Sequence, residues 1–269
     1  MIFFSKISIV FFLVFNTLNV SGQTYEIPTP KMSKNVLKSY LKMHLEYPPE
    51  AILRKEEGDV RISFVVDEKG NLIRSNVSTS VSESIDSAAL QLFSKILWNP
   101  AIISGQPKAI ESEFKIKYNI KKYNSLVKKR GYDQLPEPFI PADPSLEIYT
   151  VKELNKAPIA ILDSIYPSVR SYIANNLEFP EAASKLTIKG VVQLRFVIEP
   201  CGLPSNIMII EAVGGGCTEE AIRIVQQLKW NPGIRQSLAV RTCYNMSIKF
   251  DPSENLKNKD IPNQSNSGM

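Results

Sequence analysis

The sequence predicts an α+β protein formed by a tandem repeat of one small domain. Each copy is expected to contain a helix, a β-hairpin, a second helix and a last strand, giving a three-stranded antiparallel sheet with helices on one face. Two observations support this prediction: the two halves of the chain align with each other, and the same helical and alternating patterns follow in the same order in both. The length of 269 residues also suits two domains of about 100 residues each.

The internal repeat holds in one unbroken register. The motif Trp98-Asn99-Pro100 returns 132 positions later as Trp230-Asn231-Pro232. The same spacing matches Leu45, Tyr47, Pro48, Gly58, Val60, Phe64 and Gly70 with Leu177, Phe179, Pro180, Gly190, Val192, Phe196 and Gly202. With two copies only, the repeat indicates paired domains rather than a solenoid.

The first element of each copy is a helix, expected over residues 37–45 and 169–177. Apolar residues recur in both segments at a spacing of three and four. An aromatic-proline pair ends each helix, because the residue before a proline is driven out of the helical region. The proline then favours a short helical turn, at residues 48–51 and 180–183.

A β-hairpin follows in each copy. Apolar and polar residues alternate over residues 60–66 and 192–198, which indicates strands with one buried and one solvated face. Gly70 and Gly202 supply the positive φ of the turn that follows each strand. The return strands are expected over residues 71–78 and 203–211.

The second helix is expected to start near Asp86 in one copy and Thr218 in the other, both suitable N-caps, and to end at Trp-Asn-Pro. The last strand covers residues 111–118 and 241–250. A crossover through the second helix places this strand beside the first strand of the hairpin, in the spatial order 2-1-3. The last strand is then an exposed edge of the sheet.

These elements divide the chain into five segments. Residues 33–121 and 166–252 form the two domains, residues 122–165 an ordered but extended proline-rich linker, and residues 253–269 a disordered tail. Residues 1–22 join a lysine, a short apolar stretch and a small-residue end, which is typical of a secretory signal peptide. The alternative is an uncleaved membrane anchor, although polar residues interrupt the apolar stretch after about nine positions.

Composition argues against several classes of function. The net charge of +5 is mild and mixed, without the basic stripe that nucleic-acid binding requires. The single histidine, His44, excludes a histidine metal cluster or a Ser-His-Asp triad within one chain. Its place on an apolar helix face indicates a hydrogen-bonded residue at the edge of the core. Trp98 and Trp230 are expected to pack in the core, and no enzyme, metal or cofactor is predicted.

A set of residues resembles a known family. Tyr47-Pro48, Gly58-x-Val60, Phe64-x-Val66, Asp67-x-x-Gly70 and Trp98-x-Pro100 are similar, in order and spacing, to the C-terminal domain of TonB proteins, and this similarity recurs in the second copy. The second copy adds the glycine-rich run Gly214-Gly215-Gly216, which resembles TonB-related proteins of Bacteroidetes-type bacteria. The resemblance covers about 170 residues. It also extends to the related fold of TolA.

The resemblance implies peptide recognition by strand addition at the last strand. It also implies a periplasmic location and, as partners, periplasmic segments of TonB-dependent outer-membrane receptors or other envelope proteins. The binding edges carried over to this sequence are Glu113, Phe114, Lys115, Ile116, Lys117 and Tyr118 in the first copy, and Asn245, Met246, Ser247, Ile248, Lys249 and Phe250 in the second.

Two alternatives to this function remain open. An energy-transducing TonB has a histidine-bearing membrane helix and a long spacer, whereas residues 1–22 contain no histidine and residues 23–35 are short. A membrane-anchored energy transducer is therefore one alternative. The other is a self-associating structural module, such as a homodimer, without a peptide ligand.

The three cysteines all lie in the second copy. Export would place them in an oxidising compartment, where disulfides persist. Cys201 follows the first strand of the copy and Cys243 lies on the last strand, so antiparallel pairing makes Cys201–Cys243 the expected pair if a disulfide forms. Cys217 lies at the opposite end of the domain, where a link between molecules is the alternative.

Overall fold

The structure is a computed structural model that describes residues 25–253. The predicted signal peptide and all but the first residue of the predicted tail lie outside the described residues. The first copy contains β1 (Tyr25–Glu26), β2 (Thr29–Pro30), α1 (Lys34–His44), α2 (Pro49–Leu53), β3 (Gly58–Val66), β4 (Leu72–Thr79), α3 (Glu83–Ser94), β5 (Trp98–Asn99), β6 (Ala101–Ile103), β7 (Gln106–Lys108) and β8 (Ile110–Tyr118).

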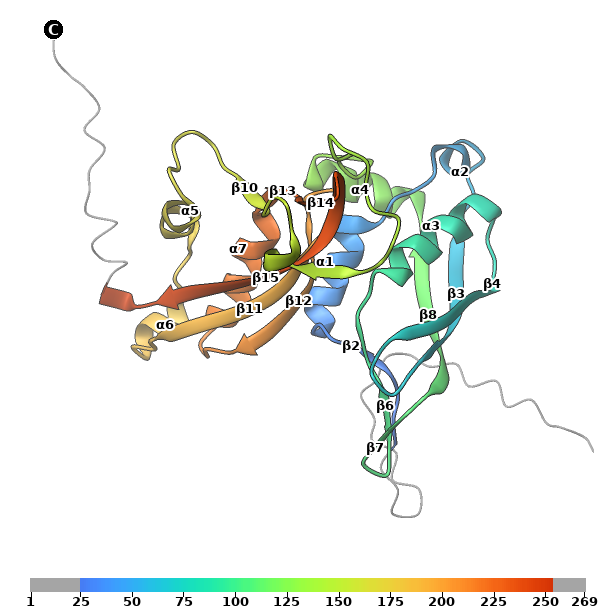
Figure 1. Ribbon diagram of the computed structural model, residues 1–269, viewed down its shortest axis with the longest axis horizontal. Coiled ribbons are helices and arrows are strands. Elements are labelled where there is room, and N and C mark those ends of the chain that lie inside the picture. Colours follow the sequence, from blue (N-terminus) through green and yellow to red (C-terminus); the bar gives the residue numbers. More distant parts are fainter. Residues whose placement is uncertain (1–24, 254–269) are drawn as a thin grey trace, which may run out of the picture.

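The connecting segment and the second copy complete the chain (Figure 1). The connecting segment contains α4 (Ile120–Arg130), β9 (Ile148–Thr150) and a 3-10 turn (Val151–Glu153). The second copy contains β10 (Ile159–Ile161), α5 (Val169–Asn176), α6 (Glu181–Lys185), β11 (Gly190–Ile198), β12 (Pro204–Glu211), α7 (Cys217–Gln227), β13 (Lys229–Asn231), β14 (Gly233–Arg235) and β15 (Leu238–Phe250).

The main sheets confirm the predicted fold class and strand order. The first copy has the order β4-β3-β8 and the second has β12-β11-β15, with antiparallel neighbours in both. The two sheets share one register, since Gly58 pairs with Tyr118 and Gly190 pairs with Phe250. The chain is therefore a mixed α+β protein with two copies of the same sheet.

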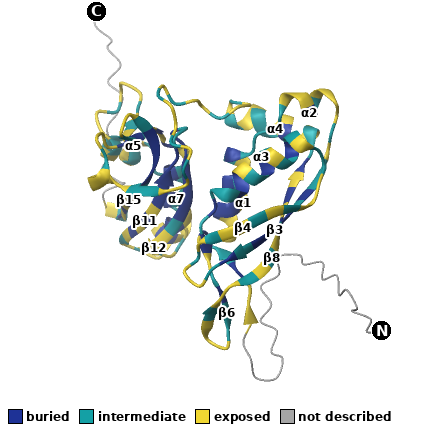
Figure 2. Cartoon of the chain, turned by 45° about the vertical axis from the view of Figure 1, so that its right-hand side comes forward, coloured by how far each residue is buried: buried dark blue, intermediate teal, exposed yellow. Residues whose placement is uncertain are grey.

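Each sheet buries one face beneath its helices (Figure 2). In the first copy Phe64, Phe93, Trp98 and Phe114 form an aromatic cluster with ring centroids between 4.5 and 5.8 Å apart. Burying a large apolar side chain stabilises a fold by about 1.5–3 kcal/mol, so such a cluster anchors the helix to the sheet. The second copy replaces it with a smaller cluster around Trp230.

The second helix of each copy starts earlier than the sequence predicts. α3 begins at Glu83 with Ser82 as N-cap, and α7 begins at Cys217. Asp86 and Thr218 lie in the first turn. Their side chains accept hydrogen bonds from the backbone N–H groups of Val81 and Val213, each five residues earlier in the chain, at 3.0 and 2.9 Å. They therefore fix the entry of the chain into the helix without being N-caps.

The repeat is longer than the sequence alignment indicates. Before each domain helix, a short strand pairs with the Trp-Asn segment, as β2 with β5 and as β10 with β13. A hairpin then follows in both copies, formed by β6 with β7 and by β14 with the start of β15. These strands have two or three residues, too few for a pattern of alternation to be recognised.

The sequence predicts an extended proline-rich linker, but in the structure this segment begins with helix α4. The Asn119 side chain caps this helix and Gly131 ends it with a φ of 79°. At the far end of α4, Arg130 donates hydrogen bonds to the carbonyl groups of Lys42, Met43 and Leu45 at 2.8–3.2 Å. These bonds satisfy the open carbonyls at the end of α1, so α4 is packed onto the first copy.

The turn glycines allow each Trp-Asn segment to approach the hairpin. A Cβ at Gly202 would lie 2.1 Å from the Trp230 carbonyl oxygen, and the φ of Gly202 is +79°. The Trp230 N–H also donates to the Gly202 carbonyl at 2.9 Å. The same approach occurs between Gly70 and Trp98.

We expect Gly202→Ala to lower the free energy of unfolding by about 2–3 kcal/mol, because the positive φ costs about 1 kcal/mol and the clash with backbone adds to it. Gly105→Ala is the matched control, since Gly105 has a φ of +76° with nothing within 4 Å of the added Cβ. Urea unfolding of both variants tests this, and equal losses of stability would contradict it.

The two copies dock through the helices of the first and the sheet of the second. α1 lies beside β12 at the centre of the molecule (Figure 1). His44 Nε2 lies 3.0 Å from the Pro204 carbonyl oxygen, and the Leu97 N–H donates to Asn206 Oδ1 at 2.9 Å. Asn206 Nδ2 donates in turn to the Lys95 carbonyl at 2.9 Å. The His44 side chain at the end of α1 and backbone groups at the end of α3 are thereby bonded to the second copy.

A buried ion pair lies beneath this interface. Arg241 Nη2 lies 3.0 Å from Glu199 Oε1, and the two side chains are 4% and 0% exposed. Arg241 also donates to the Lys95 carbonyl of the first copy at 2.8 Å. Burial acts to raise the pKa of Glu199, but the Arg241 charge and its hydrogen bonds outweigh it and lower the pKa. The carboxylate therefore stays charged inside the protein.

Candidate functional site

The last strand of the first copy is an open sheet edge. Among the described residues β8 pairs with β3 on one side and with no strand on the other. Phe114, Ile116 and Tyr118 are buried against the helices. Glu113, Lys115 and Lys117 are exposed on the opposite face. The six residues carried over from the family resemblance therefore form the outer strand of a solvated sheet.

The direction of the free backbone groups follows from the second copy. Ala239 both donates to the Pro141 carbonyl and accepts from the Asp143 N–H, so its backbone groups point away from β11. These groups alternate in direction along a strand, and the pairing of β15 with β11 runs without a register shift. The backbone N–H and C=O groups of the odd-numbered residues of β15 thus point away from β11. By the shared register, those of Glu113, Lys115 and Lys117 of β8 point away from β3.

Ion pairs hold the exposed side chains of the first sheet. Arg61 lies 2.7 Å from Glu113, Lys115 lies 3.3 Å from Asp59, and Arg74 lies 3.6 Å from Glu111. Exposed pairs of this kind contribute at most about 1 kcal/mol to stability. Charged side chains on an edge strand also oppose uncontrolled pairing of edges. The backbone groups of this edge are therefore free to pair with an added strand, while its charged side chains oppose pairing with unsuitable strands.

The corresponding edge of the second copy is partly covered. Strand β9 of the connecting segment pairs in parallel with β15, with Ile148 opposite Arg241 and Thr150 opposite Cys243. The family-derived residues 245–250 lie beyond this pairing, and no described strand pairs with their outer side. Sequence reasoning missed β9, although Ile148-Tyr149-Thr150 has the β-branched and aromatic composition of a strand.

The predicted Cys201–Cys243 disulfide does not form in the structure, where Cys201, Cys217 and Cys243 are free thiols. Cys243 lies opposite Val197 within the strand pair, whereas Cys201 lies four residues further on, in the turn that leads to β12. This offset amounts to about 10 Å or more along a strand. A disulfide needs Cα atoms within about 7 Å.

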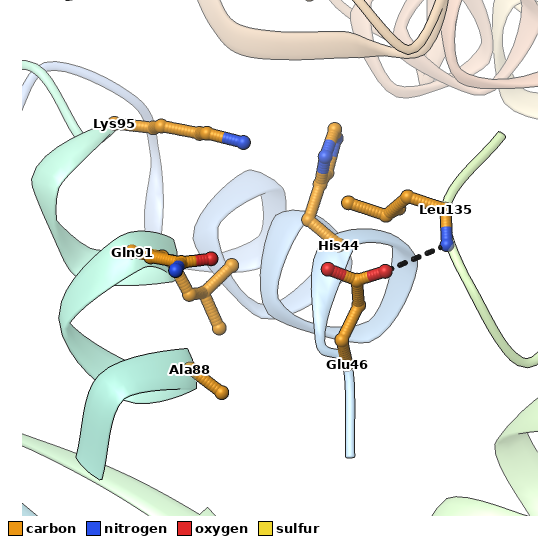
Figure 3. A pocket seen from close by; sticks show the side chains of 7 residues that line it. His44, Glu46, Ala88, Gln91, Lys95 and Leu135 are labelled. Carbon is orange, nitrogen blue, oxygen red and sulfur yellow. Dashed lines mark hydrogen bonds between the residues drawn. The ribbon is translucent and has the colours of Figure 1, made fainter. Parts of the chain in front are cut away.

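His44 is buried between the copies, as its place on the helix predicts, but its partner lies in the second copy. Its Nδ1 has no hydrogen-bond partner, and a cavity of about 20 Å³ beside it has room for about one water. Figure 3 shows Glu46, Gln91 and Lys95 around this cavity. Burial lowers the pKa of His44 to about 4 despite the nearby Glu199. The imidazole is therefore neutral and structural.

Comparison with known families identifies the two copies. The family of the Gram-negative bacterial TonB protein C-terminal domain matches residues 43–120 and 175–252, more than half of the chain. The chain belongs to this family. Its two TonB C-terminal domains correspond to the two tandem copies, and membership indicates a TonB-like role in envelope transport. The family is non-catalytic and acts in the periplasm or the cell envelope.

Two other comparisons add no relative of these TonB C-terminal domains. Neither a curated protein nor a solved structure matches the chain. Within residues 25–253, no helix has the length and apolar character needed to cross a membrane. The same residues contain no group of histidine, cysteine and acidic side chains arranged to hold a metal ion.

Proposed function

We propose that this protein is a periplasmic binding module that captures extended peptide segments by adding them as a strand beside β8. The observation that carries the proposal is the open edge of β8, with Glu113, Lys115 and Lys117 presenting their backbone groups outward. An added strand gains main-chain hydrogen bonds from these groups, while the exposed side chains select among sequences.

The partners we propose are periplasmic segments of TonB-dependent outer-membrane receptors or of other envelope proteins. Each main-chain hydrogen bond contributes about 0.5–1.5 kcal/mol after exchange with water. A short strand bound through a few such bonds has modest affinity, which suits transient capture. Recognition of this kind requires no catalytic group, metal or cofactor.

Envelope extracts test the partner class. Purified residues 23–269 are expected to retain outer-membrane receptors, and synthetic peptides of the receptors' periplasmic ends are expected to compete with them. Recovery of the protein alone, as a dimer whose β8 amides are protected from exchange, would instead favour a self-associating structural module.

We expect Lys117→Pro to weaken peptide capture about tenfold, because proline removes an outward-facing N–H from the edge. Lys117→Ala is the matched control, since it removes the charge and keeps the N–H. The dissociation constant of a competing receptor peptide is measured for both variants after circular dichroism has shown an unchanged fold. Equal binding by Lys117→Pro and Lys117→Ala would exclude β8 as the binding edge.

A further inference from the structure

The connecting segment lies on the outer edge of β15 as an added strand. The Ala239 N–H donates to the Pro141 carbonyl at 2.9 Å, and the Asp143 N–H donates to the Ala239 carbonyl at 2.8 Å. Further along, β9 continues in parallel beside residues 241–243. The outward-facing groups of this part of β15 are therefore bonded within the chain.

Side chains of the second copy also hold this segment. Arg241 Nη1 donates to the Leu146 carbonyl at 3.0 Å, and the Arg235 guanidinium lies 4.6 Å from the centre of the Tyr149 ring. The 3-10 turn that follows β9 is capped by Thr150 and Glu153 and lies against β15. Backbone, charge and an aromatic ring thus act together on one short stretch of chain.

The first copy lacks these means of holding a strand at the equivalent positions. Ala239 corresponds to Pro107, which has no N–H to donate. Arg241 corresponds to Ala109, which has no guanidinium, and among the described residues no strand pairs with the outer side of β8. The two copies have therefore diverged at the edge where a strand is added.

We infer that residues 141–150 are an internal ligand of the second copy, and that the first copy alone receives an external peptide. The inference rests on the proposed function and names the domain that performs it. The internal strand occupies the edge at positions 239–243, and the capped turn beside it closes the approach for a strand that would continue in the same register. The edge of β8 stays open to solvent.

Tethering explains why the internal strand stays in place. A segment joined to its site by a short linker has an effective concentration in the millimolar range. If the tethered segment binds this edge with an intrinsic dissociation constant of about 10 µM, an effective concentration of about 1 mM lowers the apparent affinity of an external peptide for the same edge about 100-fold. Positions 239–243 of the second copy are thereby closed to ligands of ordinary affinity.

A labelled peptide of the connecting segment tests the inference. The probe is a fluorescein-labelled synthetic peptide of residues 141–150, and both proteins compared carry Lys117→Pro, so that the β8 edge is weakened equally in each. In one of them Asp143→Pro and Tyr149→Pro also remove N–H groups that face β15. Asp143 makes its bond directly, and the register places Tyr149 between the outward-facing Arg241 and Cys243.

Fluorescence anisotropy should show at least tenfold tighter binding of the probe to the protein with the two linker prolines. Asp143→Ala with Tyr149→Ala, in the same Lys117→Pro background, is the control for lost side chains. Equal binding with and without the linker prolines, or no binding to either, would overturn the inference. Neither result depends on capture at β8, so the proposed function is judged separately by the receptor peptide.

Hydrogen exchange of the unmodified protein gives a second readout that needs no variant. The amides of Ala239 and Asp143 are expected to exchange at least 100-fold more slowly than in an unstructured peptide, because both are bonded in the added strand. Exchange at the free-peptide rate would show that the segment does not hold the edge and would overturn the inference.

Discussion

Replacing Arg241 by methionine is expected to lower the free energy of unfolding by about 3–5 kcal/mol, because it leaves the Glu199 carboxylate buried without its partner. Glu199 is fully buried, and Arg241 forms three of the hydrogen bonds that it accepts. The same change removes the bonds from Arg241 to the carbonyls of Lys95 and Leu146. The substitution therefore weakens the core of the second copy, the docking of the first copy and the attachment of the connecting segment to β15.

Denaturant unfolding measures this effect, with Arg195→Met as the matched control. Arg195 is exposed on β11 and bonds to Asn245 at 3.0 Å, so its replacement should cost less than about 1 kcal/mol. Adding Glu199→Gln to Arg241→Met should recover part of the stability, because it removes the unpaired charge. A cost for Arg241→Met no greater than that of Arg195→Met would contradict the prediction.

The stability of the protein is expected to fall by about 2 kcal/mol between pH 7 and pH 5 through His44 alone. The pKa of His44 is about 4 in the folded protein, against an ordinary value of 6.5. The unfolded chain therefore takes up the proton first as the pH falls, and protonation favours unfolding. The contribution is fully present above pH 6.5 and is lost progressively as the pH falls towards 4.

The groups that face His44 do not reverse this sign. Burial is the largest cause of its lowered pKa, the nearby Lys95 and Arg130 act in the same direction, and Glu199 acts against them. The pKa of Glu199 is itself lowered from 4.5, so that carboxylate stays charged between pH 5 and 7. His44→Gln keeps a donor for the Pro204 carbonyl but does not titrate. Urea unfolding across this range should show a flatter dependence for His44→Gln, and parallel curves would contradict the assignment.

The sequence predicts the core of each copy because both strand patterns and aromatic positions repeat in it. Alternation along β3 and β11 identifies the buried face, and Trp98 and Trp230 lie where the sequence places them, in the core. The open edge of β8 also follows, since connection rules fix the strand order. These features depend on patterns local to one copy.

The docking of the copies does not follow from the sequence. A lone His44 on an apolar helix face indicates a buried, bonded residue, but nothing in the sequence points to Pro204, 160 residues away. Glu199 and Arg241 look like ordinary charged residues until the fold brings them together. Strand β9 escapes prediction because its three residues are too few to show a pattern of alternation, although their composition favours a strand.

The docking of the two copies also bears on whether further molecules can add to the chain in the same way. Helix α1 of the first copy packs on β12 of the second, so two different surfaces meet, and a step of this kind could repeat without closing into a ring. The equivalent helix α5 has no buried residue and is open to a further unit. Yet His44 corresponds there to Asn176, and at the other open end Asn206 and Arg241 correspond to Arg74 and Ala109. His44, Asn206 and Arg241, which hold the step, are therefore replaced at both open ends, and this replacement disfavours a repeat of the same docking between molecules.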